Sequence, residues 1–338
     1  MRVHSLKIRR FKQFGEYEAT FTEPDLDTPR DLVVLIGNNG KGKSTILQAI
    51  ALVLGMATGR LASPAELEWP GFDYALAGNA WSESPEIEMM VVFAQKEIEA
   101  AIACFRAYYS EYFDIQGIDF PQRITINFSK NNLNLDDFTK NILFQGRDNA
   151  IKVLKWIPKE IDIFKIIGSV FWFHEHRSAL PGDDDLRIHL DQWHNFHLRI
   201  ARGDYQLRPG QQDLFKGIHD AWQSIFPGRS FVGSIPGDFG VSTVPKYYFS
   251  DGQRDYELAE MSGGERAILP ILIDFARQNI HNSVVLIDEI ELHLHPPLQQ
   301  ALVRALEHLG QNNQFIITTH SQSVLDVVFD SDIHRVYL

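Results

Sequence analysis

The sequence predicts an α/β protein whose sheet is mainly parallel, flanked by helices, and interrupted by an α+β insertion. Two observations predict the sheet. Residues 32–36 form an unbroken apolar run, which is typical of a strand buried on both faces of a parallel sheet. From about residue 255 onward, short apolar runs alternate with helical patterns, as in parallel α/β folds. A third observation predicts the insertion, because helices and short strands are mixed without that alternation between these two regions.

In chain order, the pattern predicts strands at 2–8, 16–22, 32–36, 86–94 and 123–128, with helices at about 44–55 and 95–113. Residues 59–85 contain several Pro, Gly and Ser residues and are expected to form a loop. Residues 161–173 fit either a helix or a strand. Amphipathic helices are predicted at 186–201 and 211–226, loops and short strands at 227–245, and a strand at 246–249. The last part reads as helix 263–278, strand 284–287, helix 296–309, strand 314–318, helix 322–328 and strand 333–337. We therefore expect an N-terminal lobe at 1–95, an insertion at 96–250 and a C-terminal lobe at 251–338.

Composition limits the class of protein. The 338 residues are 44% hydrophobic and 22% charged, the balance of an ordinary globular protein. No apolar run approaches the roughly 18 residues that span a membrane, and the N-terminus lacks a signal-peptide core. The single cysteine, Cys104, cannot form an internal disulfide, so we expect a cytoplasmic protein. The net charge of −12 argues against a protein that coats nucleic acid, although a local basic patch would still allow DNA binding.

A glycine-rich segment lies between the buried strand and the first helix and fits the pattern G-x-x-x-x-G-K-[ST]. Glycines allow the backbone to approach a phosphate, and N–H groups at a helix N-terminus point at the anion. Lys43 is expected to reach the β- and γ-phosphates, and the Ser44 hydroxyl to ligate Mg²⁺. A flexible glycine turn is the alternative, but it explains neither the lysine nor the spacing. The predicted phosphate-binding residues are Gly37, Asn38, Asn39, Gly40, Lys41, Gly42, Lys43, Ser44 and Thr45.

Two carboxylates follow the predicted strand 284–287. Carboxylates at the carboxyl edge of a sheet suit a hard cation, and ligands bind at this edge in open α/β sheets. Asp288 is therefore expected on Mg²⁺, and Glu289 is expected to orient and polarise the attacking water. Two acids after a strand are, taken alone, more often a solvated loop. The phosphate-binding loop upstream favours the metal site.

The segment Met261-Ser262-Gly263-Gly264-Glu265 precedes that strand by one helix. Ser262 and Glu265 have the S-x-x-E spacing of a capping box, so a simple helix start explains them. Two glycines in the first turn, however, cost about 1 kcal/mol each relative to alanine. They indicate a backbone that must come close to a ligand, and thus a second anion site.

These motifs, followed by Thr318-Thr319-His320-Ser321, occur in the order typical of ABC-type ATPases, and the sequence resembles that family. The N-terminal start, the distance between phosphate loop and signature, and the stretch 289–296 (Glu-Ile-Glu-Leu-His-Leu-His-Pro) resemble the SMC/RecF/OLD branch. That branch includes stand-alone prokaryotic AAA-family ATP-binding proteins. The resemblance covers about residues 1–58 and 255–338, and leaves the middle third unexplained. It implies a P-loop NTPase with an ABC-type head.

The resemblance also implies ATP and Mg²⁺ as cofactors, the reaction ATP + H₂O → ADP + phosphate, and a head-to-tail homodimer that holds two ATP molecules. His320 resembles the switch histidine that contacts the γ-phosphate; a histidine packed in a core is the alternative. The implied catalytic residues are Lys43, Glu289 and His320. The implied metal ligands are Ser44 and Asp288. The residues that face the ATP of the partner subunit are Ser262, Gly263 and Gly264, and residues 292–295 are implied to couple the two sites.

Several features leave alternatives open. The basic turn around Arg10 and Lys12 is either a nucleotide contact or an exposed edge. The glutamine of the Q-loop is not evident; Gln95 and the segment 174–177 are both candidates, and the second is preferred. Pro270 is expected to kink the helix 263–278. A metal site made by Glu291, His293, His295 and His320 is less favoured, because their spacing alternates faces.

Three downstream functions are compatible with such a head. The first is DNA repair or anti-phage defence, with ATP-dependent dimerisation as the switch and a protein effector as partner. The second is an ATP-gated module that restrains a toxin or nuclease without acting on DNA. The third, a transporter subunit, is the least favoured, because the insertion and the stretch 291–296 do not suit it. We expect no membrane partner.

Overall fold

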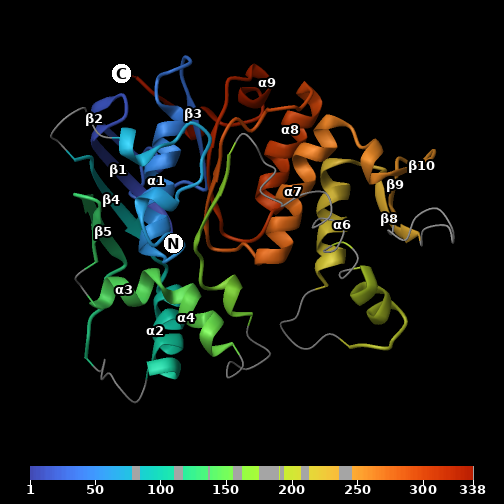
Figure 1. The fold of residues 1–338 in the computed structure, drawn as a ribbon, viewed down its shortest axis with the longest axis horizontal. Coiled ribbons are helices and arrows are strands. Elements are labelled where there is room, and N and C mark those ends of the chain that lie inside the picture. Colours follow the sequence, from blue (N-terminus) through green and yellow to red (C-terminus); the bar gives the residue numbers. More distant parts are fainter. Residues whose placement is uncertain are drawn as a thin grey trace.

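The computed structural model describes residues 1–77, 84–109, 117–135, 138–154, 162–174, 190, 194–206, 213–235 and 246–337. These residues form two five-stranded sheets, a three-stranded sheet and helices that pack around them (Figure 1). In this part of the chain no helix is long and apolar enough to cross a membrane.

The first sheet is antiparallel and has the order β2-β1-β4-β5-β6. Its strands are β1 (Arg2–Phe11), β2 (Phe14–Thr20), β4 (Glu86–Val92), β5 (Arg123–Ser129) and β6 (Asn132–Asn134). The predicted N-terminal hairpin is confirmed, but its turn is shorter than expected. Strand β1 continues to Phe11 because Phe11 pairs with Phe14. Arg10 and Lys12 have φ angles of 54° and 52°, a region that non-glycine residues rarely occupy.

The central sheet is parallel throughout, with the order β13-β3-β12-β11-β7. Its strands are β3 (Leu32–Ile36), β7 (Val170–Phe173), β11 (Val284–Ile287), β12 (Gln314–Thr318) and β13 (Ile333–Arg335). The prediction of a mainly parallel sheet is therefore confirmed. The segment 161–173, which fitted either a helix or a strand, contains a 3₁₀ turn followed by β7.

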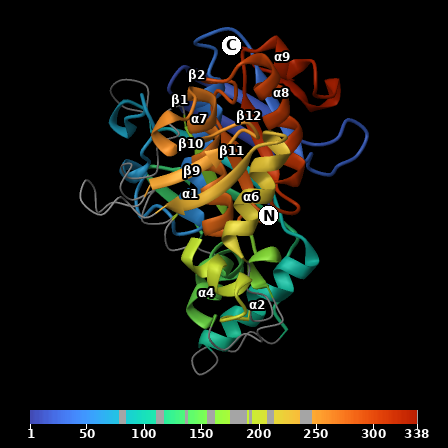
Figure 2. The ribbon, with the colours of Figure 1, turned by 90° about the vertical axis from the view of Figure 1, so that its right-hand side faces the viewer.

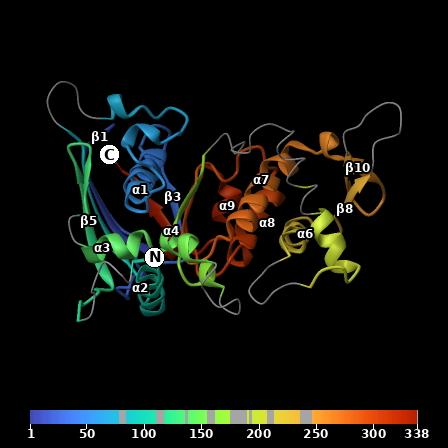
Figure 3. The ribbon, with the colours of Figure 1, turned by 60° about the horizontal axis from the view of Figure 1, so that its bottom comes forward.

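Two layers cover the central sheet (Figure 3). Helix α1 (Lys43–Ala57) lies between the two large sheets, and Val284 and Leu286 belong to the core around it. The alternate residues Val285 and Ile287 belong to a second core, on the opposite face. That face is covered by α6 (Leu214–Ile225), α7 (Gly263–Gln278), α8 (Pro296–Ala305) and α9 (Gln322–Leu325). The period-two alternation of the strand side chains thus divides the apolar residues between two layers.

Residues from the predicted insertion contribute to several parts of the molecule, including strands β5 and β6 of the antiparallel sheet. Helices α2 (Gln95–Tyr109), α3 (Phe138–Phe144) and α4 (Gly146–Val153) gather at one end of the molecule (Figures 1 and 2). Strands β8 (Ser230–Ile235), β9 (Lys246–Ser250) and β10 (Asp255–Glu257) form the small sheet beyond α6. Strand β7 joins the central sheet. The division at residues 95 and 250 stays a prediction.

Predicted helix ends differ from the observed ones at several places. Helix α1 ends at Ala57, two residues later than predicted, and α6 ends at Ile225, one residue earlier. The predicted helix 186–201 lies partly outside the described residues. Helix α8 ends at Ala305 and a 3₁₀ turn follows, and α9 ends at Leu325. Helix α7 has the predicted bounds and is assigned as one continuous helix across Pro270.

Candidate nucleotide site

The predicted motifs meet at the carboxyl edge of the central sheet. The phosphate loop follows β3, Asp288 and Glu289 follow β11, and His320 follows β12. Because α7 precedes β11 by a short connection, it runs antiparallel to that strand, and its N-terminus points to the same edge. This is the edge at which open α/β sheets bind ligands.

The N-terminal hairpin packs on the phosphate loop. Gly42 has a φ of 92°, and a Cβ atom added there would lie 2.3 Å from the Phe14 ring and 2.7 Å from Gln13 Nε2. The Thr45 hydroxyl donates a hydrogen bond to Gln13 Oε1 at 3.0 Å. A glycine is therefore required at Gly42 by both backbone angle and space. Sequence reasoning marked this turn as basic and aromatic, but missed Gln13 and Phe14 as contacts of the loop.

Lys43 lies inside the loop that precedes it. Its Nζ donates hydrogen bonds to the carbonyl oxygens of Gly37 (2.9 Å) and Asn38 (3.3 Å). Burial lowers the pKa of Lys43, and the charges of Asp288, Glu289 and Glu291 oppose that shift. The amine is thus directed at the concave side of the loop and close to the carboxylates.

Asp288 accepts two hydrogen bonds on one oxygen. Ser44 Oγ donates to Asp288 Oδ1 at 3.0 Å, and Thr318 Oγ1 donates to the same atom at 2.6 Å. The Glu289 N–H in turn donates to Thr318 Oγ1 at 2.7 Å. Glu289 has a φ of 46°, a strained angle for this residue type, and Thr318 helps to hold it there. Hydroxyl and carboxylate oxygens are the donors that Mg²⁺ prefers, so Ser44 and Asp288 fit that ion.

Ile290 and Glu291 also form hydrogen bonds with residues at the end of β12 and just beyond it. The Ile290 N–H donates to the Thr318 carbonyl at 3.1 Å, and Glu291 Oε1 accepts from the His320 backbone N–H at 2.6 Å. The His320 side chain is exposed at this edge. Within the described residues, no three His, Cys, Asp or Glu side chains are arranged to hold a metal ion. The less favoured metal site of Glu291 with three histidines therefore finds no support there.

The signature segment caps α7, as its spacing predicts. Ser262 Oγ accepts from the Glu265 N–H at 3.3 Å, and Glu265 Oε2 accepts from the Ser262 N–H at 2.8 Å and from its hydroxyl at 2.7 Å. Tyr256 and Arg229 also hydrogen-bond to Glu265. Burial favours a raised pKa for Glu265, but these donors and the Arg229 charge outweigh it, and the pKa is lowered. The signature glutamate is thus anchored to the small sheet and the loop before it.

The two glycines of the signature differ in their surroundings. A Cβ atom at Gly263 would meet nothing within 4 Å, whereas one at Gly264 would lie 3.0 Å from Leu298. Packing within the chain therefore explains Gly264 but not Gly263. Ser44, Asp288 and Thr318 are in direct contact. The central sheet lies between α1 and α7, so residues 262–264 lie on the face of the sheet opposite α1.

The remaining candidates are placed as follows. Arg10 forms an ion pair with Glu86. Lys12 Nζ donates to Gln48 Oε1 of α1 at 2.9 Å; burial lowers its pKa, and Asp288 opposes this. Of the Q-loop segment 174–177, only His174 is among the described residues; it follows β7, beside β11. Gln95 begins α2, away from this edge, and donates to Glu99.

Comparison with known proteins agrees with this arrangement. A family model described as "AAA domain, putative AbiEii toxin, Type IV TA system" matches residues 32–326. The chain belongs to this AAA-domain family. A second model, described as "AAA domain", matches residues 1–59. Membership of the AAA-domain family implies nucleotide binding.

Individual relatives and one solved structure match nearly all of this chain. The chain is 24% identical to the Retron Vc95 probable ATPase of Vibrio cholerae, covering 98% of this chain and 73% of that protein. It is 22% identical to the Septu protein PtuA of Bacillus mycoides, covering 98% of this chain and 40% of that protein. A crystal structure of an SMC head bound to the C-winged helix domain of ScpA superposes with a TM-score of 0.55 at 15% identity, covering 100% of this chain and 98% of that one. The predicted fold, a P-loop ABC-type ATPase head, is confirmed.

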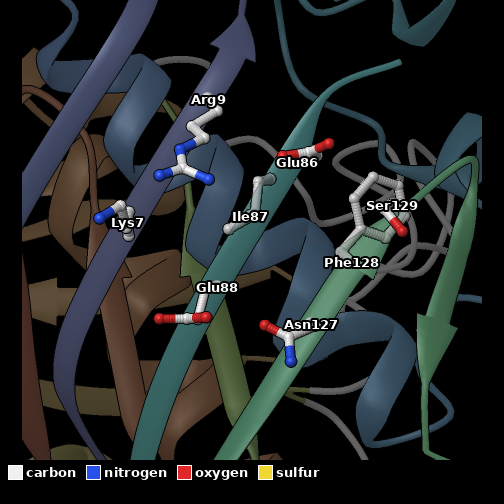
Figure 4. A pocket seen from close by; sticks show the side chains of 8 residues that line it. All are labelled: Lys7, Arg9, Glu86, Ile87, Glu88, Asn127, Phe128 and Ser129. Carbon is white, nitrogen blue, oxygen red and sulfur yellow. The ribbon is translucent and has the colours of Figure 1, made fainter.

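A separate hollow lies on the outer face of the antiparallel sheet, between β1, β4 and β5 (Figure 4). Its basic residues are Lys7 and Arg9, which pair with Glu18 and Glu16 of β2. Their charges are already balanced, and this face points away from α1. This hollow contains none of the residues that the motifs predict for nucleotide binding.

Proposed function

We propose that this AAA-domain protein binds and hydrolyses ATP at the carboxyl edge of its central sheet. The observation that carries this proposal is the hydrogen-bonded group Ser44–Asp288–Thr318, next to the buried Lys43. It joins the phosphate loop to the carboxylates over a sequence separation of 244 residues. A glycine turn that binds no ligand would not require this hydrogen-bonded group.

Each residue has a role in this proposal. The backbone N–H groups of residues 37–45 bind phosphate oxygens. Lys43 gives up its hydrogen bonds to the carbonyl oxygens of Gly37 and Asn38 and binds phosphate oxygens instead. Ser44 and Asp288 would hold Mg²⁺, which would offset the negative charge of the phosphates. Glu289 orients and polarises the attacking water, and Thr318 fixes the Glu289 backbone. His320 contacts the γ-phosphate.

We further propose that two copies close on the nucleotide as a head-to-tail homodimer. Ser262 and Gly263 lie at the same sheet edge as the phosphate loop but on the opposite face, so a two-fold axis can bring them to the ATP of a second copy. The open space at Gly263 supports this, since packing within the chain leaves room there for a phosphate to approach. ATP then acts as the switch, because closure lasts while the γ-phosphate contacts both copies.

Two variants test hydrolysis and closure separately. Lys43→Ala should abolish nucleotide binding and turnover, since it removes the buried cation that we propose to bind the β- and γ-phosphates. Glu289→Gln should bind ATP, fail to hydrolyse it, and elute as a dimer with Mg²⁺ and ATP in gel filtration with light scattering. Hydrolysis at the wild-type rate by both variants would refute the assignment.

Downstream, we propose a role in anti-phage defence together with a protein effector. The names of the relatives refer to a retron and to a Septu system, and the family description refers to a toxin–antitoxin system. The net charge of −12 favours a protein partner over a duplex as the primary contact. The second candidate is a module that restrains an effector without acting on DNA; DNA repair has no observation of its own here.

Cofactors, compartment and partners can be measured together. We expect ATP and Mg²⁺ to be required and the protein to fractionate with the cytoplasm. Co-purification of a protein encoded beside its gene, without any effect of duplex DNA on ATPase activity, favours the restraining module. Stimulation by duplex DNA that falls steeply with salt favours action on DNA.

A further inference from the structure

Glu291 is a half-buried residue at the candidate nucleotide site, and one of its carboxylate oxygens is buried in a way that the proposed roles do not explain. It lies in the turn after β11, three residues beyond Asp288. One carboxylate oxygen, Oε1, accepts the His320 backbone hydrogen bond at 2.6 Å. The other oxygen, Oε2, is buried and has no hydrogen-bond donor within the described part of the chain.

Stability does not account for this carboxylate. A buried acceptor without a donor costs about 1–3 kcal/mol, so a turn selected only for stability has no use for an acid here. A serine or asparagine could accept the same N–H without leaving a second buried oxygen unpaired. Buried groups that lack a partner are typical of functional sites.

The contact with His320 is the last of four hydrogen bonds that join residues 288–291 to residues 318–320. Thr318 binds Asp288 and the Glu289 N–H, and the Ile290 N–H binds the Thr318 carbonyl. These contacts fix the strand end, but His320 lies beyond them and its side chain is exposed. Among the hydrogen bonds described above, only the one to Glu291 involves the backbone of His320. A charge-assisted bond of this kind is about twice as strong as a neutral one.

We propose that Glu291 is a positioning residue for ATP hydrolysis: it fixes the His320 backbone through Oε1, so that the ring meets the γ-phosphate. The inference rests on the proposed function, since it assumes that His320 contacts the γ-phosphate. Glu291 touches neither nucleotide nor metal in this scheme. Its proposed role in the reaction is to position His320.

The test is a series of variants measured with and without His320. Glu291→Gln keeps an acceptor but removes its charge, and Glu291→Ala removes the acceptor. We expect kcat to fall by about 10- to 100-fold in the alanine variant and by less in the glutamine variant, with the Kd for nucleotide unchanged. In a His320→Ala background, the proteins with glutamate, glutamine or alanine at position 291 should have the same kcat within about twofold. Glu307→Ala, at an exposed site on the same lobe, is the matched control.

Backbone hydrogen exchange gives a second measure that needs no turnover. The His320 amide should exchange faster in Glu291→Ala, while the amides of β11 keep their protection. Wild-type kcat or wild-type exchange in Glu291→Ala overturns the inference, as does an undiminished effect of Glu291→Ala in the absence of His320. Failure of the wild-type protein to hydrolyse ATP would instead overturn the proposed function.

Discussion

Replacing Thr318 with valine tests the hydrogen-bonded centre of the site without changing its shape. Valine keeps the branched side chain, but it removes the donor to Asp288 and the acceptor for the Glu289 N–H. Thr318 is 1% exposed, so water cannot easily replace either bond. A hydrogen bond to a charged group contributes about 1.5–3 kcal/mol, and a buried N–H without an acceptor costs about 1–3 kcal/mol.

Together these terms predict a loss of about 3 kcal/mol of unfolding free energy, since Ser44 still donates to Asp288 and limits the damage. The measurement is urea unfolding of Thr318→Val and of Thr318→Ser, which keeps the hydroxyl. The serine variant should lose about 1 kcal/mol, the value for one buried methyl group. ATPase activity should fall in the valine variant only, because Glu289 loses the contact that holds its φ of 46°. If valine proves as stable and as active as threonine, the central role of this hydroxyl is wrong.

Three further predictions follow from other contacts. Gly263→Ala should raise the unfolding free energy by up to about 1 kcal/mol, because alanine favours helix and nothing lies near the new Cβ, but it should weaken ATP-dependent dimerisation in light scattering. Arg229→Met should cost about 2 kcal/mol in urea unfolding, since Glu265 stays buried without its cation, and Arg229→Lys should recover part of this. Burial lowers the pKa of His281 to about 4, below its unfolded value of about 6.5, so the folded state binds fewer protons and is destabilised as pH falls through 6.5. This amounts to about 2 kcal/mol between pH 7.5 and 5, and a His281→Asn variant should lack that part of the pH dependence.

The sequence was most informative where local signals agree. The bounds of α7 and of β11, β12 and the phosphate-loop strand β3 match their predictions, because capping residues, glycines and unbroken apolar runs mark them. The capping box of Ser262 and Glu265 is present as its spacing predicts. The roles of Lys43, Glu289 and His320 stay predictions.

Contacts between residues that are far apart in the sequence could not be predicted from the spacing of residues along the chain. Strand β7 could not be told from a helix, because its four residues are fixed by pairing with β11 and not by local propensity. The end of α9 was placed too late, since Val327 and Val328 are β-branched and favour leaving the helix. Nothing local indicates that Arg229 and Tyr256 would meet Glu265, or that Phe14 would rest on Gly42.

The pairing order of the central sheet has a consequence for biosynthesis. Strand β3, which carries the phosphate loop, hydrogen-bonds on both sides to strands made some 280 and 300 residues later, β12 and β13. While the ribosome is still adding the last third of the polypeptide, β3 therefore has no neighbour on either side, and Ser44 has no Asp288. The hydrogen-bonded group Ser44–Asp288–Thr318 can therefore form only after the segment that contains β12 has been synthesised.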